Sequence, residues 1–134
     1  MGYRSASLDE LGGYGFRKIR SPLGVTAFGV NAIVYPPGAE GVLHYHDEQD
    51  ELYFVHSGTA RFDVDGDVRE LGPGGLAHVE ATTPRIVSNV GDDDLVLLII
   101  GGKNGYVGRD GQLVNPADLA KRQAMSSGEF SAST

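Results

Sequence analysis

The sequence contains no cysteine and no tryptophan, and it is poor in positive charge. Without cysteine, disulfides, thiolate metal sites and cysteine nucleophiles are excluded, and a reducing compartment is the simpler setting. Eleven lysines and arginines stand against 18 aspartates and glutamates, which gives a formal net charge of -7. This excess of negative charge repels nucleic-acid backbones and anionic membranes, so neither is expected as a partner.

Long apolar segments are also missing. The longest run, residues 95–100, is too short to span a bilayer, and residues 1–16 lack the apolar core of a signal peptide. We therefore expect a cytoplasmic protein without a membrane partner. A length of 134 residues predicts one domain that can bury a substantial core.

Glycine, in contrast, is abundant. Twenty glycines divide the chain into short apolar segments, and this pattern is typical of an all-β domain. The turn at Asp65 and Gly66, between two short segments of strand-like sequence, predicts a hairpin. Strands are predicted at residues 16–20, 25–35, 44–46, 51–58, 60–64, 68–71, 76–79, 85–90 and 95–102. Together they predict an antiparallel barrel or sandwich.

The segments outside these strands carry weaker signals. Residues 5–11 predict one helical turn with Ser7 as its cap. An asparagine followed by proline predicts a short C-terminal helix near residues 116–125, and residues 126–134 are expected to be disordered. The glycine-rich stretch at 101–112 does not open a helix, so it predicts a solvated loop and not a phosphate-binding loop.

Residues 41–58, GVLHYHDEQDELYFVHSG, contain the clearest chemical signal. His44 and His46 point to the same face of a strand because side chains alternate with a period of two. Glu51 returns on the next strand after a short acidic loop. Two imidazoles and a carboxylate on one face suit a divalent transition metal. The same alternation places Tyr53 on the face of Glu51 and His56 on the opposite face.

These positions resemble the first sequence motif of the cupins, in which HxH is followed after four residues by Glu and after six more by Gly. The matching positions are Gly41, His44, His46, Glu51 and Gly58. The resemblance extends over about residues 25–101 and implies a single cupin domain over residues 1–134. Such a domain is a jelly-roll β-barrel, here with its core at about residues 15–103. Cupins usually hold one metal inside the barrel and commonly form homodimers, and an exposed sheet edge gives a physical reason for pairing.

The second cupin motif, which supplies a last histidine ligand, fits the sequence in two registers. One register uses the segment PGGLAH and ends at His78, but it leaves too few residues for the hairpin between the motifs. The other runs from Gly74 to Asn89, preserves the hairpin and puts Arg85 at the histidine position. We prefer the second register. An arginine offers only donors and keeps its charge, so it cannot ligate a cation.

Three interpretations of this site stay open. In the first, His44, His46 and Glu51 hold one divalent transition metal, which would be Fe, Mn, Zn or Ni. Arg85 would then anchor an anionic substrate beside it. In the second, no metal binds and Glu51 forms a buried ion pair with Arg85. In the third, His78 turns inward as a replacement ligand; otherwise it is expected to be a hydrogen-bonded core residue.

Two functional hypotheses follow from these interpretations. The first is a metal-dependent dioxygenase or isomerase that acts on a small organic acid or phenolic compound. The second is a metal-free cupin that binds a small molecule in a barrel containing the Glu51–Arg85 pair. In either case, Tyr35 and Tyr53 are expected to line the pocket with hydroxyl donors.

Overall fold

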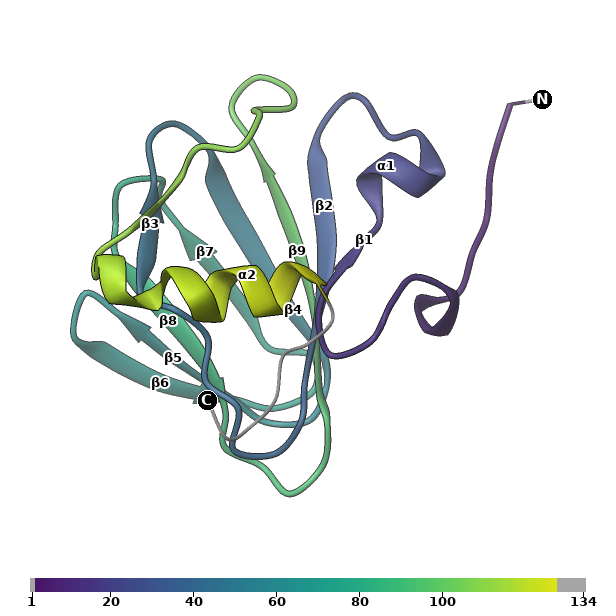
Figure 1. The fold of residues 1–134 in the computed structure, drawn as a ribbon. Coiled ribbons are helices and arrows are strands. Elements are labelled where there is room, and N and C mark those ends of the chain that lie inside the picture. Colours follow the sequence, from purple (N-terminus) through teal and green to yellow (C-terminus); the bar gives the residue numbers. More distant parts are fainter. Residues whose placement is uncertain (1, 128–134) are drawn as a thin grey trace.

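Ten strands form two five-stranded antiparallel sheets that pack face to face (Figure 1). The computed structural model describes residues 2–127, so most of the tail that was predicted to be disordered lies outside the described residues. The first sheet has the order β1 (Gly15–Lys18), β2 (Gly29–Tyr35), β9 (Leu95–Gly102), β4 (Asp50–Ser57), β7 (Leu76–Val79). The second has the order β10 (Gly111–Leu113), β3 (His44–His46), β8 (Arg85–Asn89), β5 (Ala60–Val64), β6 (Asp67–Leu71). The predicted jelly-roll barrel is confirmed.

The short helical elements lie near the two ends of the chain. They are η1 (Leu8–Glu10), α1 (Arg20–Leu23), η2 (Pro116–Asp118) and α2 (Leu119–Ser127). Ser7 precedes η1 as predicted, and the side chain of Asn115 accepts a hydrogen bond from the Ala117 amide at the start of η2. No helix among residues 2–127 has the length and apolar character needed to cross a membrane.

Two strand predictions were wrong at their boundaries. The strand predicted at 16–20 ends at Lys18, because the chain turns through α1 and Gly24, which has a left-handed φ of 69°. The next strand therefore begins at Gly29 and not at residue 25. The glycine-rich stretch predicted as a solvated loop contains strand β10, which pairs with β3.

The core lies between the two sheets and follows the alternation of each strand. In β4, Tyr53 and Val55 are buried, whereas His56 faces outward. The largest fully buried side chains are Arg85, Tyr35, Tyr53, Phe62, Leu95, Leu97 and Val55. Arg85 is the one charged residue of this set, so its environment needs a separate explanation.

Close packing explains why two of the motif positions are glycine. A Cβ atom at Gly41 would lie 2.8 Å from the hydroxyl of Tyr35 and 2.9 Å from the carbonyl oxygen of Val87. Gly58 has a φ of 85°, and a Cβ there would lie 2.6 Å from the carbonyl oxygen of Asp94. Any larger residue would force the backbone apart at both positions.

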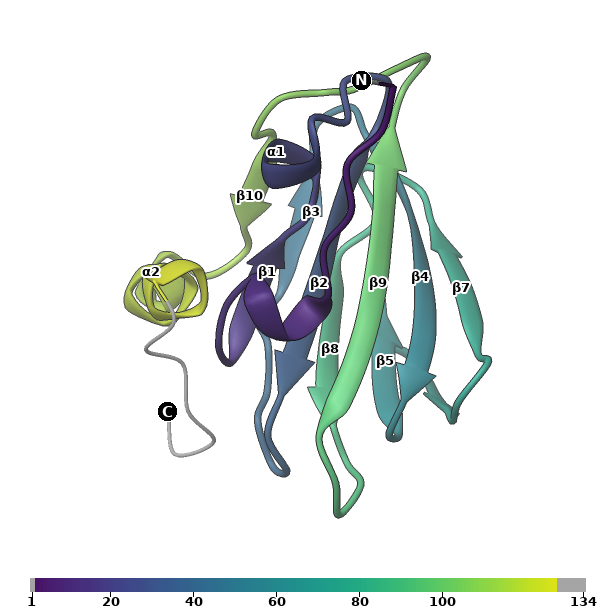
Figure 2. The same cartoon turned by 90° about the vertical axis from the view of Figure 1, so that its right-hand side faces the viewer.

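Helix α2 lies beside the edge of the first sheet. Figures 1 and 2 show it next to β1, on the side of the molecule where β10 forms the edge of the second sheet. Met125 anchors the helix because its side chain is buried in the core, with 2% of its surface exposed. The backbone of Met125 lies so close to Gly15 that a Cβ at that glycine would collide with the Met125 carbonyl.

Candidate metal centre

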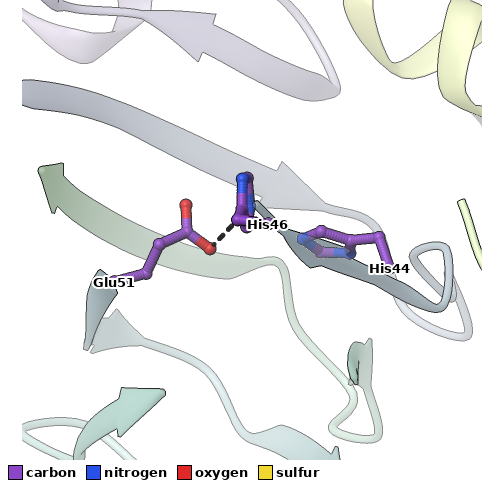
Figure 3. Close-up of side chains that lie close together, drawn as sticks. All are labelled: His44, His46 and Glu51. Carbon is purple, nitrogen blue, oxygen red and sulfur yellow. Dashed lines mark ion pairs between the residues drawn. The ribbon is translucent and has the colours of Figure 1, made fainter. Parts of the chain in front are cut away.

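Strands from both sheets supply the cluster shown in Figure 3. His44 and His46 begin and end β3 in the second sheet, and Glu51 lies on β4 in the first. One ligand atom from each of the three side chains lies within 4.8 Å of the other two. The alternation predicted from the sequence therefore brings these three residues together between the sheets.

Each imidazole is held by its Nδ1 atom. Nδ1 of His44 lies 3.0 Å from the carbonyl oxygen of Val42, and Nδ1 of His46 lies 2.8 Å from Oδ1 of Asp110. A ring that donates from Nδ1 leaves Nε2 available to a metal, and metal-binding histidines are usually oriented in this way. Both histidines are therefore set up as Nε2 ligands.

The spacing of the donor atoms also fits a metal. Nε2 of His46 lies 3.1 Å from Oε1 of Glu51. This is close to the separation of about 3 Å expected for two adjacent ligands that each lie about 2.1 Å from one ion. Nitrogen and carboxylate ligands of this kind suit Zn, Fe, Mn or Ni. The residues present thus fit a divalent transition metal.

Without a metal, the same atoms form an ion pair. Burial disfavours the imidazolium of His46, but its contacts with Glu51 and Asp110 outweigh burial and raise the pKa of His46. Burial likewise opposes ionisation of Glu51, yet the hydrogen bond and charge of His46 hold the pKa of that carboxyl below its usual value. Burial lowers the pKa of His44, which favours its neutral form. A metal must therefore displace a proton from His46 but not from His44.

Arg85 lies next to Glu51, where the preferred register of the second motif predicts it. Arg85 lies directly opposite His44 in the β3–β8 pair, and its Nη1 lies 3.1 Å from Oε1 of Glu51. Its Nη2 donates to the carbonyl oxygens of Glu80 and Ala81, at 2.7 and 3.3 Å. The side chain is 0% exposed, and its Nε has no hydrogen-bond partner among residues 2–127. The buried ion pair of the second interpretation is therefore present.

The role predicted for Arg85 as a substrate anchor does not agree with this environment. Glu51 and Tyr53 line a cavity in the barrel, whereas Arg85 does not line it and has no exposed surface. Its donors face Glu51 and the main chain. Arg85 thus positions the Glu51 carboxylate and has no access to a ligand in the cavity.

The two predicted tyrosines both line the cavity. The hydroxyl of Tyr53 donates to Oε1 of Glu51 at 2.8 Å, so this oxygen faces three donors: Tyr53, Arg85 and His46. Burial raises the pKa of Tyr53 and of Tyr35 above the ordinary value of a tyrosine. Both hydroxyls therefore keep their protons at neutral pH, and the hydroxyl of Tyr53 acts as a donor.

His78 does not join the cluster. It is directly opposite Leu52 in the β4–β7 pair, on the outer face of the first sheet, and its side chain is exposed. The interpretation of His78 as a replacement ligand and its alternative as a core residue are both wrong. Side chains alternate between the two faces of β7, so Val79, the next residue, is buried while His78 faces outward.

Asp110 is a further site residue, which the sequence did not predict. Besides His46, it accepts hydrogen bonds from the amides of Glu48 and Gln49 and from the side chain of Gln49, at 2.6–2.9 Å. Burial opposes its ionisation, but these hydrogen bonds hold the pKa of Asp110 well below its ordinary value. Its position in a glycine-rich stretch, 64 residues from His46, gives no signal in motif spacing.

The cluster forms part of the lining of a cavity of about 950 Å³. The cavity extends from the histidines and Glu51 towards β1, α1 and the inner face of α2. Its volume is in the range of small-molecule sites in proteins. A small organic ligand therefore has room next to the candidate metal ligands.

Comparison with known proteins agrees with this geometry. The model of the cupin domain family matches residues 32–101, just over half of the chain. A stretch of 65 residues is 29% identical to the uncharacterized protein MJ1618 of Methanocaldococcus jannaschii, covering 48% of this chain and 52% of that protein. The matched stretch thus spans about half the length of this curated relative.

Two solved structures illustrate the likeness of the fold. A cupin protein from Bacteroides fragilis superposes with a TM-score of 0.67 at 24% identity, covering 77% of this chain and 86% of its own. A sugar phosphate isomerase from a cupin superfamily, from Silicibacter pomeroyi, gives a TM-score of 0.61 at 28% identity, covering 66% of this chain and 58% of its own. The family match, the barrel and the histidine pair agree: this chain belongs to the cupin family.

Proposed function

We propose that this cupin is a metal-dependent enzyme, a dioxygenase or isomerase, that acts on a small organic acid or phenolic compound. The observation that carries the proposal is the orientation of the two imidazoles. Both have Nδ1 occupied by an acceptor, so both Nε2 atoms are available together with the carboxylate of Glu51. A set of two histidines and one carboxylate leaves coordination positions open for a substrate.

Each residue around the cluster has a separate task in this proposal. His44, His46 and Glu51 would hold the metal, and a metal bound there would act as a Lewis acid towards an oxygen atom of the substrate. Arg85 fixes the Glu51 carboxylate from behind. Tyr53 donates to the same carboxylate from a position that lines the cavity. The Silicibacter pomeroyi protein is described as a sugar phosphate isomerase, which supports the isomerase alternative.

A second candidate function is binding of a small molecule without metal or turnover. It is favoured by the environment of Oε1 of Glu51, which already faces Arg85, Tyr53 and His46 as donors. In that state, the imidazolium of His46 bridges the carboxylates of Glu51 and Asp110. The cluster is then satisfied electrostatically by protein groups alone.

Elemental analysis distinguishes the two functions. The protein is purified without a histidine tag, nickel resin or chelator, and its transition metals are quantified. The metal-dependent function predicts a near-stoichiometric metal that is lost in His44→Ala and retained in His56→Ala, a matched control because His56 is exposed on the outer face of β4. Protein that is empty and also refuses added Fe(II), Mn(II) and Zn(II) would instead support the binding function.

Oxygen consumption then separates the two reaction types. Metal-loaded protein is screened with aromatic and small-acid compounds in an oxygen electrode, and the products are analysed by mass spectrometry. Uptake of oxygen with an oxidised product supports a dioxygenase. An isomeric product of unchanged mass, formed without oxygen uptake, supports an isomerase.

A further inference from the structure

The cavity beside the cluster is rich in positive charge although the whole chain is acidic. Its lining includes four cationic side chains, contributed by Lys18, Arg20, Arg109 and Arg122. Only two carboxylates, Glu51 and Asp110, share this lining. In a chain with a formal net charge of -7, this is a local reversal of sign.

The two carboxylates are already engaged. Glu51 lies against Arg85 and His46, and Asp110 accepts hydrogen bonds from His46 and from Gln49. The four cations differ in this respect, because none of them forms an ion pair with a carboxylate among residues 2–127. A ligand in the cavity therefore meets uncompensated positive charge.

Local structure explains why Lys18 and Arg20 face the cavity. Phe16 and Lys18 share one face of β1, while Arg17 faces the other way and forms an ion pair with Asp9. The guanidinium of Arg20 lies 3.9 Å from the ring centroid of Tyr106, which restricts its position.

Helix α2 adds a further cation, Arg122. Arg122 lies on the face of α2 that lines the cavity, together with Leu119, Gln123 and Ser126. These positions are spaced by three and four residues, as one face of a helix requires. Lys121, its neighbour in sequence, does not line the cavity and provides a matched comparison.

All four cations lie outside residues 32–101, which match the cupin family model. The family region supplies the histidine and glutamate cluster at one end of the cavity, and the flanking segments supply the positive charge. Figure 2 shows these segments, which contain β1, α1, β10 and α2, gathered at one side of the two sheets. The choice of ligand can thus be set by the flanking segments.

We propose that the cavity selects compounds with a doubly charged anionic group, a phosphate, which binds among Lys18, Arg20, Arg109 and Arg122. Three of the four are arginines, whose planar guanidinium groups match phosphate oxygens with paired hydrogen bonds. A singly charged carboxylate would neutralise less of this charge. The proposal rests on the proposed function and narrows its substrate class to small organic acids or phenolic compounds that carry a phosphate group.

The test uses inorganic phosphate as the probe and metal-free protein, with binding measured by isothermal titration calorimetry at low salt. We expect saturable binding that is at least about five-fold tighter than that of acetate and that weakens when sodium chloride is added. Arg122→Gln should weaken phosphate binding at least about five-fold, whereas Lys121→Gln should change it by less than about two-fold.

The outcomes separate this proposal from the proposed function. Metal content measured in Arg122→Gln should equal that of the wild type, and His44→Ala should lose metal but keep phosphate binding. If no metal binds at all while phosphate still binds, the enzyme proposal fails and this inference stands. Absent phosphate binding, equal losses in the Arg122 and Lys121 variants, or acetate binding as tight as phosphate would each overturn the inference.

Discussion

Replacement of Arg85 by methionine should destabilise the metal-free protein strongly. The change removes the cation 3.1 Å from Oε1 of Glu51 while keeping an unbranched apolar chain of similar length. Glu51 has only 8% of its surface exposed, so its carboxylate then stays buried without its nearest permanent cation. Removal of one partner from such a buried pair costs about 3–5 kcal/mol of unfolding free energy. For a chain of this size, this corresponds to a fall in Tm of roughly 10–20 °C.

A double-mutant cycle isolates the effect of the charge. Glu51→Gln removes the carboxylate charge but keeps the shape, so the double variant Glu51→Gln with Arg85→Met should be less destabilised than the sum of the single variants. A coupling of about 1–3 kcal/mol is expected. Urea denaturation in the presence of a chelator measures all four proteins. Arg61→Met is the control, since Arg61 is half exposed and its contact with Glu70 is 3.9 Å long.

Two results would refute this reasoning. A loss below about 1 kcal/mol in Arg85→Met would show that Glu51 does not depend on the guanidinium. Strict additivity in the double variant would show that the loss comes from the hydrogen bonds of Arg85 to the main chain and not from the ion pair.

The remaining predictions concern the metal, the pH response and assembly. Arg85→His should raise metal affinity at least about 100-fold, measured by competition with a chelating dye, because it replaces a nearby cation by a neutral ligand; unchanged affinity would show that Arg85 does not occupy the ligand position. Asp110→Asn should lower metal affinity about 10–100-fold in the same assay, and an unaltered affinity would remove its orienting role. Although burial opposes it, contacts with Glu51 and Asp110 raise the pKa of His46. The imidazolium of His46 therefore contributes its full stabilisation below about pH 6.5, and this contribution is lost as the pH rises through the pKa of the folded state. In urea titrations of the metal-free proteins, the stability difference between wild type and His46→Gln should shrink as the pH rises. Finally, we expect a homodimer in sedimentation experiments, and Leu76→Asp on the outer sheet face, where Leu76 is 62% exposed, should yield monomers; wild-type protein that is only monomeric would remove this expectation.

Local alternation explains how much could be predicted from the sequence. His44, His46 and Glu51 lie on short strands whose side chains alternate strictly, so their common face follows from residue spacing alone. The same rule places Tyr53 on the face of Glu51 and His56 on the opposite face, and in the structure Tyr53 is buried and His56 is exposed. These inferences need no knowledge of distant contacts.

The remainder of the site depends on long-range pairing. His78 faces outward because β7 pairs with β4 in one register, and nothing near residue 78 fixes that parity. Asp110 reaches His46 because β10 pairs with β3 across a long connection. The sequence places Arg85 at the ligand position, but only the packing around Glu51 shows that its side chain is buried behind that carboxylate.

The contact between Gly15 and Met125 links strand packing to ligand preference. Gly15 has a φ of 99° and leaves no room for a side chain against the backbone of α2. The same helix carries Arg122 on its cavity face. A substitution as small as Gly15→Ala would therefore lift α2 and withdraw a positive charge from the cavity, although residue 15 itself does not line it. The anion preference proposed for this barrel would thus change through a substitution remote from the ligand, without altering His44, His46 or Glu51.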